Sequence, residues 1–441
     1  MTSHRLAAWI GERPMGTLSY DDQSGLFAFA YDPDWTASGS SFTLSPALPY
    51  RKSVETNAQH HSLSVRRFFE NLLPEGRALE DAVATHRLSK ANLYGLLHAL
   101  GRESTGAISL LPEGTRPGQV PDTLRQITFA ELSARIRNRA HEPFNVWDGR
   151  VRMSIAGYQD KLAVYLRDGN LYLVEGRLAS THIIKPASLS PNLPHLVANE
   201  HFCLKLAARM ALPAIDVDLL RVPDPVLLVE RFDRRRGDDH VERLHVIDAC
   251  QALDLGVSHK YERNFGSGRD VAHIRDGVNI ERLFSITANA LSGAALRLGL
   301  LRWILVQYLI GNSDAHGKNI SFFVEPGGIR LAPTYDLVAV CVYTEVDHEL
   351  AMAIGDEFDV SKVRACAWAE LADTSGLQRR LVAREMLRMT KALRKALPDL
   401  AAWPGYTDEE RSLVGKIATF ALAQADRLDG VAKELPQMRI D

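Results

Sequence analysis

The sequence has few cysteines and no closely spaced cysteine pair. Only four of its 441 residues are Cys, at positions 203, 250, 341 and 366. A disulfide framework in a small domain, or a structural zinc site, needs cysteines that recur at short and regular spacing. We therefore expect core thiols in a reducing compartment, and neither a disulfide framework nor a zinc site.

Long uninterrupted apolar runs are also missing. Near the N-terminus, Leu6–Ile10 is too short for the apolar region of a signal peptide, and Gly-Glu-Arg-Pro follows it. The most apolar stretch, Gly293–Ile310, contains Arg297, Arg302 and Gln307. Such polar residues are costly in a membrane span, so we expect no membrane segment and a cytoplasmic protein.

Positive charge is not in excess. The net charge is −2 and the isoelectric point is about 6.7. No general basic field would attract nucleic acid, so any DNA binding would need a local patch or a partner protein. The hydrophobic fraction of 46% and the charged fraction of 24% are ordinary for a soluble globular protein. The length allows two or three domains.

The most informative stretch is residues 311–337, GNSDAHGKNISFFVEPGGIRLAPTYDL. An apolar segment leads to a polar loop, two short apolar runs separated by Pro-Gly-Gly form a predicted hairpin, and a second acid follows. Asp314 and Asn319 have the D-x-x-x-x-N spacing of the base and the metal-binding amide in protein kinases, and Asp336 follows where a kinase has its metal-binding acid. The alternative is an Asx-rich loop whose side chains only cap backbone groups. The joint pattern favours a phosphotransfer site.

The first part of the chain predicts a small α+β domain, residues 1–112. Its predicted elements are three strands of a meander, two helices (the second with Ser89 as N-cap) and a final strand: Leu6–Ile10, Met15–Tyr20, Leu26–Tyr31, Val65–Leu73, Ser89–Leu100 and Ala107–Leu111. The stretch Pro112–Thr123 has three prolines and two glycines, which is typical of a linker. We assign residues 113–150 to a linker and a helix.

The next part, residues 151–235, is rich in predicted strands and has one long helix. The strands and the helix are Val151–Ala156, Lys161–Leu166, Leu171–Glu175, Thr181–Ile184, Val217–Val222 and Val226–Glu230, with the helix at Leu193–Leu212. This is the element order of a kinase N-lobe. Residues 236–441 are predicted to be mainly helical apart from the hairpin at 320–332, and amphipathic helices are expected at Leu377–Leu397 and Asp408–Leu428.

Several residues outside the central stretch could contact a nucleotide. Lys185 ends an apolar strand, where a kinase has its phosphate-binding lysine, and Glu200 in the next helix could orient it. A surface lysine at a strand end is the simpler interpretation. His316 could lie near the transferred phosphoryl group or could only stabilise its loop. The arginine run 234–236, beside Asp238 and Asp239, is interpreted as a solvated loop.

Taken together, these segments resemble the HipA-type serine/threonine kinase toxins. The resemblance rests on Gly16-Thr17-Leu18, Phe68–Pro74, Ser154–Lys161, His182–Lys185, Asn199-Glu200, Val229–Asp233, Asp248–Leu253, Asp314–Asn319 and Tyr335-Asp336. Each motif alone is weak, but their occurrence in this order along nearly the whole chain is specific. The resemblance implies an α+β, bilobed kinase-like fold with a β-rich N-lobe and a mainly helical C-lobe, preceded by the small N-terminal subdomain.

The resemblance also implies a site, cofactors and partners. ATP and Mg²⁺ would bind with Asp314 as the catalytic base and with Asn319 and Asp336 as metal ligands. The other expected nucleotide contacts are Lys185, His316, Lys318, a phosphate-covering loop made of Ser154, Ile155, Ala156, Gly157 and Tyr158, and Glu230, Arg231 and Phe232 at the adenine. Members of the family phosphorylate aminoacyl-tRNA synthetases, are neutralised by a small DNA-binding antitoxin, and autophosphorylate a serine that corresponds to Ser154. DNA would be bound only through that antitoxin.

Two other functions remain open at this point. A small-molecule phosphotransferase shares the Asp-x-x-x-x-Asn loop and the later acid, although a small substrate gives no reason for the N-terminal domain. A non-catalytic co-repressor that supports an antitoxin on DNA would not need Asp314, Asn319, Asp336 and Lys185 together.

Overall fold

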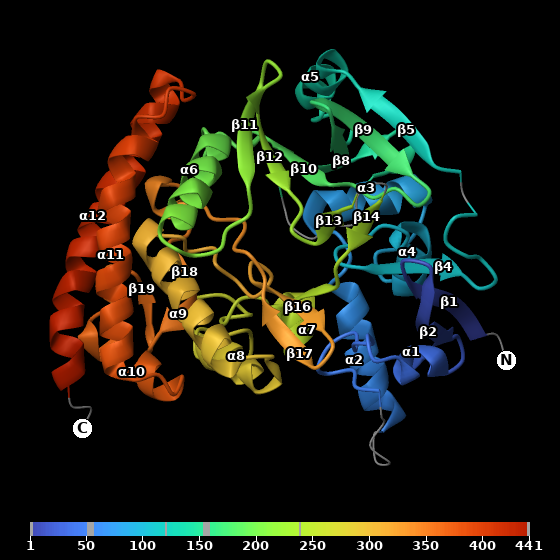
Figure 1. Ribbon diagram of the computed structural model, residues 1–441, viewed down its shortest axis with the longest axis horizontal. Coiled ribbons are helices and arrows are strands. Elements are labelled where there is room, and N and C mark those ends of the chain that lie inside the picture. The colour runs from blue at the N-terminus through green and yellow to red at the C-terminus, as the bar shows by residue number, and fades with distance from the viewer. Residues whose placement is uncertain (1–2, 51–56, 120, 153–158, 238–239, 439–441) are drawn as a thin grey trace.

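The computed structural model describes residues 3–50, 57–119, 121–152, 159–237 and 240–438. The chain forms two lobes and a smaller N-terminal subdomain, which all meet around the middle of the molecule (Figure 1). The sheet of the N-lobe lies at the top of the view, the N-terminal subdomain at the lower right, and the long C-terminal helices along the left edge.

The N-terminal subdomain is a four-stranded antiparallel sheet in the order β3-β2-β1-β4, covered by helices. Its elements are β1 Ser3–Ile10, β2 Arg13–Asp21, β3 Phe27–Tyr31, α1 Pro33–Ala37, α2 Ala58–Glu70, α3 Gly76–His86, α4 Leu93–Leu100 and β4 Ile108–Pro112. Alternate residues of β1, Leu6 and Ala8, are fully buried, as expected for a strand with one face on the core. Helix α2 packs against β3, where Phe69 contacts Phe29, and its other buried residues include Val65 and Phe68.

The N-lobe is a six-stranded sheet in the order β11-β12-β10-β8-β9-β5. Its elements are β5 Thr123–Ile127, α5 Phe129–Asn138, β6 Val146–Trp147, β7 Arg150–Val151, β8 Leu162–Arg167, β9 Asn170–Glu175, β10 His182–Pro186, α6 Leu196–Arg209, β11 Val217–Arg221 and β12 Pro225–Glu230. Strand β10 lies between β12 and β8, so Lys185 stands near the centre of the sheet, opposite Leu227.

The C-lobe is mainly helical. Its helices are α7 Ala249–Ala252, α8 Ile280–Ser285, α9 Gly293–Ile310, α10 Ala365–Thr374, α11 Arg379–Ala401 and α12 Asp408–Glu434, with short 3₁₀ helices at Val257–His259, Ile286–Asn289, Val340–Val342 and Leu435–Gln437. Its strands are β13 Arg234–Arg236, β14 Val241–Arg243, β15 Val246–Asp248, β16 Ser321–Glu325, β17 Gly328–Leu331, β18 Glu349–Ile354 and β19 Glu357–Asp359. Helix α9 is long and apolar enough to span a membrane, but it is a core helix that packs against α11 and α12 and is mostly buried.

Most predicted elements are confirmed, with local corrections. The meander, the hairpin at 320–332 and the two amphipathic C-terminal helices are present. The N-cap of α4 is Asn92 and not Ser89, because the Asn92 side chain accepts the hydrogen bond from the amide of Gly95. The C-lobe also contains more strands than expected. Strand β15 pairs with the predicted hairpin to give a three-stranded sheet, and β18 and β19 form a separate two-stranded sheet.

Residues 113–150, assigned from the sequence to a linker and a helix, contain helix α5 and also an edge strand of the N-lobe. Strand β5 pairs with β9 from Thr123↔Glu175 to Ile127↔Leu171. Ile127 and two residues of α5, Leu132 and Ile136, are buried in the same core cluster as β8 and β9. We therefore propose that the N-lobe starts near Thr123 and not at residue 151.

Candidate active site

Helix α9 delivers the polar loop that follows it. The helix ends at Gly311, which has a φ of +67° and so adopts the left-handed conformation that glycine reaches at little cost. A Cβ at this position would lie 2.6 Å from Cys341 Sγ. The side chain of Asn312 then accepts a hydrogen bond from the amide of Asp314 and donates one to Gln307 of α9. The start of the loop is thereby fixed to a buried helix.

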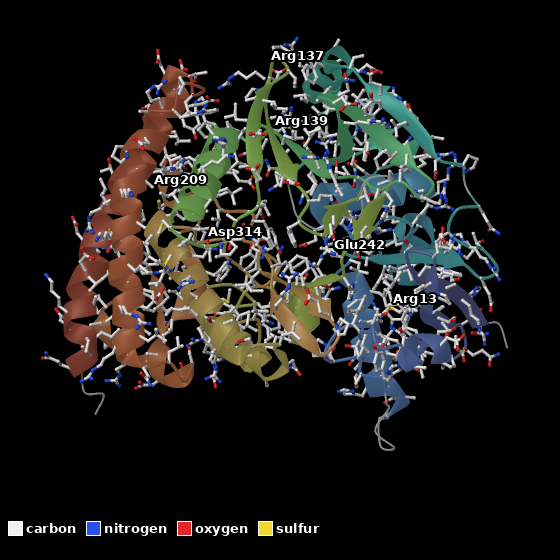
Figure 2. The ribbon with its side chains drawn as sticks, in the orientation of Figure 1. Arg13, Arg137, Arg139, Arg209, Glu242 and Asp314 are labelled. Carbon is white, nitrogen blue, oxygen red and sulfur yellow. The ribbon has the colours of Figure 1, made fainter. Side chains whose placement is uncertain are left out.

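Asp314 lies near the centre of the molecule, between the two lobes (Figure 2). Its carboxylate opens into a cavity of about 970 Å³. Loss of solvation by the surrounding protein raises the pKa of Asp314 to about 6. The hydroxyl of Tyr261, 2.6 Å from Oδ1, acts in the opposite direction and favours the ionised form. The negative charge of Asp336 raises the pKa further. A carboxyl group with a pKa in this range can accept a proton at neutral pH.

The remainder of the loop folds back on Asp314. The side-chain amide of Asn319 donates a hydrogen bond to the backbone carbonyl of Asp314, with a distance of 2.8 Å. The amides of His316 and Asn319 donate to the carbonyls of Asp314 and His316. Because the nitrogen of the Asn319 amide is used in this way, its carbonyl oxygen is the atom that could bind a cation.

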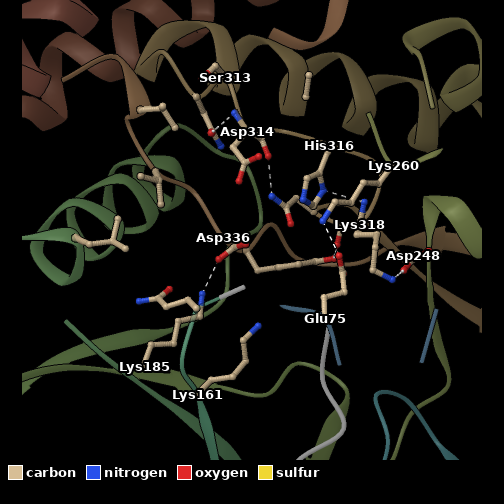
Figure 3. Close-up of a pocket in the computed structure, with 18 of the residues that line it drawn as sticks. Glu75, Lys161, Lys185, Asp248, Lys260, Ser313, Asp314, His316, Lys318 and Asp336 are labelled. Atoms are coloured by element: carbon tan, nitrogen blue, oxygen red, sulfur yellow. Dashed lines mark hydrogen bonds and ion pairs between the residues drawn. The ribbon is translucent and has the colours of Figure 1, made fainter. Parts of the chain in front are cut away.

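Asp336 reaches the same cavity from the strand β17 side. Figure 3 shows it between Asp314 and two lysines, Lys185 and Lys161. Asp336 has a φ of +55°, an uncommon conformation for a residue with a side chain, which often occurs at functional sites. Burial alone would raise the pKa of its carboxyl, but Lys185 and Lys161 outweigh burial and hold that pKa well below its usual range.

Lys185 links the two lobes. Its Nζ lies 2.6 Å from Glu200 Oε1 on α6 and 2.6 Å from Asp336 Oδ1. Burial alone would lower the pKa of Lys185, but the two carboxylates outweigh burial and raise it. The predicted orientation of Lys185 by Glu200 is therefore present, and the simpler interpretation of Lys185 as a surface lysine is wrong, since its side chain is only 9% exposed.

The segment Glu230–Phe232 lines the other end of the cavity. The backbone amides of Glu230 and Arg231 donate to the carbonyls of Asp216 and Thr181. The ring of Phe232 stacks on Tyr335 with centroids 5.5 Å apart. Of the residues expected at the adenine, Glu230 and Arg231 therefore have backbone amides that are already paired within the protein.

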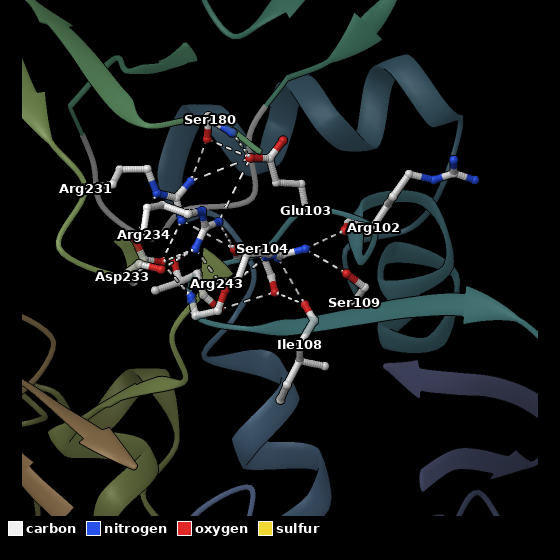
Figure 4. Close-up of polar contacts among 12 residues, drawn as sticks. Arg102, Glu103, Ser104, Ile108, Ser109, Ser180, Arg231, Asp233, Arg234 and Arg243 are labelled. Atoms are coloured by element: carbon white, nitrogen blue, oxygen red, sulfur yellow. Dashed lines mark hydrogen bonds and ion pairs between the residues drawn. The ribbon is translucent and has the colours of Figure 1, made fainter. Parts of the chain in front are cut away.

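The arginines at this end belong to a buried network (Figure 4). Arg231 and Arg234 both donate to Asp233 Oδ2, at 2.7 and 2.8 Å, and all three side chains are buried. Arg234 also donates to the carbonyls of Ser104 and Gly106 in the N-terminal subdomain. The interpretation of the arginine run as a solvated loop is wrong for Arg234, because local sequence does not show that its counter-ion and acceptors lie inside the protein.

Comparison with known proteins shows the family of this chain. Family models described as the HipA N-terminal domain and the HipA-like C-terminal domain match residues 6–111 and 153–397. The chain is 38% identical over 436 residues to the serine/threonine-protein kinase toxin HipA of Shewanella oneidensis. This alignment covers 98% of this chain and 97% of that protein. The chain belongs to the HipA family. It is also 31% identical over 407 residues to the putative kinase Y4mE of Sinorhizobium fredii, which covers 90% of this chain and 92% of the relative.

A solved structure confirms the predicted fold. HipA in the Shewanella oneidensis complex of HipA, HipB and operator DNA aligns with a TM-score of 0.89 and 37% identity, covering 99% of this chain and 100% of that one. This HipA-family chain therefore has the α+β, bilobed kinase-like fold with an N-terminal subdomain, and it is a serine/threonine-protein kinase.

Two residues of the loop 312–319 in this HipA-family chain have side chains that are held inside the protein. Lys318 lines the cavity, but its ammonium donates to Asn71 and to Asp248, at 2.9 and 2.7 Å. Burial alone would lower the pKa of Lys318, and Asp248 outweighs it and raises that pKa. The Nδ1 of His316 accepts the amide hydrogen of Lys318, and burial lowers the pKa of His316 to about 3. Both residues therefore shape the loop.

Sequence reasoning missed three residues at this HipA site. Lys161 lies beside Lys185, and burial together with that neighbouring positive charge lowers its pKa to about 8. Glu75 and Lys260 form a buried ion pair at 2.6 Å. No spacing signal could reveal this pair, because it joins positions far apart in the sequence. The predicted loop residues Ser154, Ile155, Ala156, Gly157 and Tyr158 lie outside the residues that the structure describes.

The donor set fits Mg²⁺ in a nucleotide-dependent HipA site. Asp336 offers an ionised carboxylate and Asn319 an amide oxygen, and Mg²⁺ prefers oxygen ligands. Within the described ranges no group of three or more His, Cys, Asp or Glu residues gathers as a metal cluster. In kinases the substrate phosphates supply further oxygen ligands, so one or two protein ligands suffice.

Proposed function

We propose that this HipA-family kinase is the toxin of a toxin–antitoxin module and transfers the γ-phosphate of ATP to a serine or threonine of an aminoacyl-tRNA synthetase, which halts translation and promotes dormancy. The observation that carries the proposal is the convergence of Asp314, Asp336 and Lys185 on one cavity from three separate elements. The choice of a synthetase as substrate rests on the family resemblance.

In this mechanism each residue has one role. Asp314 accepts the proton of the substrate hydroxyl, as its raised pKa and open position allow. Lys185, held by Glu200, binds the phosphates of the nucleotide. Asn319 and Asp336 would hold Mg²⁺, which when bound neutralises charge on the phosphate oxygens. At the adenine we propose Glu230, Arg231 and Phe232; the Phe232 backbone is the best-placed donor, because the other two amides are paired.

The loop of Ser154, Ile155, Ala156, Gly157 and Tyr158 is proposed to cover the phosphates, and Ser154 to be the autophosphorylated residue. Incubation of the full-length protein with Mg-ATP alone, followed by mass spectrometry, tests both the activity and the site. We expect one phosphate on Ser154 and none in an Asp314→Ala variant. An unmodified chain that instead phosphorylates small hydroxylated compounds would establish the small-molecule phosphotransferase.

A second experiment tests toxicity. Expression of the wild type in the cytoplasm of a bacterial host should stop growth, whereas expression of Asp336→Ala should not. Equal toxicity of the two would refute a catalytic mechanism. Phosphoproteomics shortly after induction would identify the synthetase.

The proposed partner is a small DNA-binding antitoxin, through which the protein meets DNA. The solved relative was crystallised with HipB and its operator DNA, which supports this partner. The net charge of −2 also favours indirect DNA binding. In a gel-shift assay the chain alone should leave operator DNA unshifted and should supershift the antitoxin–DNA complex. The co-repressor role can coexist with catalysis. A chain that does not hydrolyse ATP but increases the affinity of the antitoxin for operator DNA would favour co-repression alone.

A further inference from the structure

Tyr261 contacts the proposed catalytic base directly. Its hydroxyl donates a hydrogen bond to Asp314 Oδ1, and the two oxygens are 2.6 Å apart. Its ring packs edge-on against His316, with centroids 5.0 Å apart and an interplanar angle of 85°. Tyr261 comes from the segment between the 3₁₀ helix at Val257–His259 and α8, which is separate from the catalytic loop.

The contact has the geometry of an acceptor hydroxyl. A general base must lie within about 2.6 to 3.2 Å of the oxygen whose proton it removes. In phosphoryl transfer to serine or threonine, that oxygen is the substrate hydroxyl. The Tyr261 hydroxyl therefore occupies a position at Asp314 Oδ1 that has the right distance for a substrate hydroxyl.

The backbone around Tyr261 is fixed, while its side chain lines the cavity and is partly exposed. Lys260 on one side is buried, forms the ion pair with Glu75 and accepts the amide hydrogen of Gly317 through its carbonyl. Glu262 on the other side is also buried and accepts from the amide of Ala353. The side chain of Tyr261 lies between these two anchors but is 36% exposed. Displacement of the Tyr261 side chain would expose Asp314 Oδ1.

We propose that Tyr261 holds the acceptor position of the kinase in the absence of a protein substrate, and that the serine or threonine hydroxyl of the substrate displaces it. This inference rests on the proposed phosphotransfer function of Asp314. The chemical consequence concerns water, which is an available acceptor besides Ser154 when no protein substrate is present. When water reacts, its oxygen bonds to the γ-phosphorus, the bond to the bridging oxygen breaks, ADP leaves, and the water proton passes to Asp314. The Tyr261 hydroxyl competes with that water.

The test is the initial rate of phosphate release from Mg-ATP by the full-length protein without any protein substrate. Tyr261→Phe keeps the ring and removes only the hydroxyl, so it should fold normally and admit water to Asp314. Loss of one competing hydrogen bond should raise the hydrolysis rate about two- to tenfold. The dissociation constant for Mg-ADP, measured by calorimetry, should stay the same, because the substitution lies where the phosphate acceptor binds and not where the nucleotide binds.

Tyr172→Phe is the matched control, because Tyr172 lies on β9 of the N-lobe sheet, in a separate part of the fold. It should hydrolyse ATP at the wild-type rate. A Tyr261→Phe rate equal to or below that of the wild type would overturn the inference and leave the kinase function intact. Phosphate on Tyr261 itself would also overturn it, since the hydroxyl would then be an acceptor in its own right. A wild type that neither binds nor cleaves Mg-ATP would overturn the proposed function and the inference together.

Discussion

Replacement of Asp233 by Asn should destabilise the junction between the N-terminal subdomain and the Glu230–Phe232 end of the cavity. The carboxylate of Asp233 accepts four hydrogen bonds: two from Arg231, one from Arg234 and one from the amide of Gly106. The next acid, Glu103, is 3.9 to 4.0 Å from the two guanidinium groups. The Asn variant would therefore leave two buried cations with one distant counter-charge.

The expected cost follows from this count. Removal of one partner from a buried ion pair typically costs about 3 to 5 kcal/mol, because the remaining charge stays buried without compensation. Asparagine keeps one acceptor oxygen, but its amide group would face an arginine donor. We therefore expect Asp233→Asn to lower the free energy of unfolding by about 3 kcal/mol or more. That is a large part of the 5 to 15 kcal/mol that is usual for a folded protein.

Glu242→Gln provides the matched control. Glu242 pairs with Arg235 at 3.1 Å, and both side chains are at least half exposed. The same change of charge should cost less than about 1 kcal/mol there.

Urea denaturation gives the total loss, and hydrogen exchange read by mass spectrometry shows where it occurs. Peptides that cover residues 102–112 and 225–237 should exchange faster in Asp233→Asn, and those from α11 and α12 should not. A second change, Arg231→Gln, should cost less in the Asp233→Asn background than in the wild type, since the two residues share their bonds. A loss of stability no greater than that of the Glu242 control would refute the reasoning.

Three further predictions concern other parts of the fold. Glu200→Gln should lower kcat/KM about tenfold or more in a phosphotransfer assay, because Lys185 would lose its charged partner on α6 and be drawn to Asp336 alone; an unchanged value would argue against orientation by Glu200. Gly311→Ala should lower the free energy of unfolding by about 2 to 4 kcal/mol, because the backbone is left-handed and the added Cβ would contact Cys341. Gly415→Ala in α12 should be neutral or slightly stabilising, because the added Cβ would meet no neighbouring atom. Burial lowers the pKa of His201 from about 6.5 to about 4, so the neutral imidazole contributes fully to stability above pH 6.5 and progressively less as the pH falls towards 4. At pH 5 the free energy of unfolding should be lower by about 2 kcal/mol. His201→Phe should therefore flatten the curve of unfolding free energy against pH.

Sequence reasoning succeeded where the chemistry lies within one short segment. Asp314 and Asn319 belong to one loop, and the five-residue spacing sets the loop geometry through bonds such as that from Asn319 to the Asp314 carbonyl. The pairing of Lys185 with Glu200 could also be predicted, because a strand end and the following helix lie close together in a βα connection. The N-lobe could be located because each strand has a hydrophobic pattern within its own short segment.

It failed where a charge finds its partner far along the chain. A run of three arginines has the same local sequence whether it is solvated or buried. Asp233 is the direct neighbour of Arg234, but the other acceptors of the buried guanidinium are the carbonyls of residues 104 and 106, far away in the sequence. Tyr261 gave no signal either, because it lies 53 residues before Asp314 in a segment without regular structure. Strand β5 was missed because the linker composition of Pro112–Thr123 concealed the start of the strand at Thr123.

The N-terminal subdomain is part of the kinase cleft in a physical sense. It supplies the acceptors for three buried cations of the cleft: Glu75 for Lys260, Asn71 for Lys318, and the carbonyls of residues 104 and 106 for Arg234. A buried cation without acceptors is strongly unfavourable, so each of these contacts makes the geometry of the cleft depend on the subdomain. Lys318 belongs to the same loop as Asp314, and the carbonyl of Lys260 accepts the amide hydrogen of Gly317 in that loop. A partner that shifts the subdomain would therefore act on the position of Asp314 without entering the cavity.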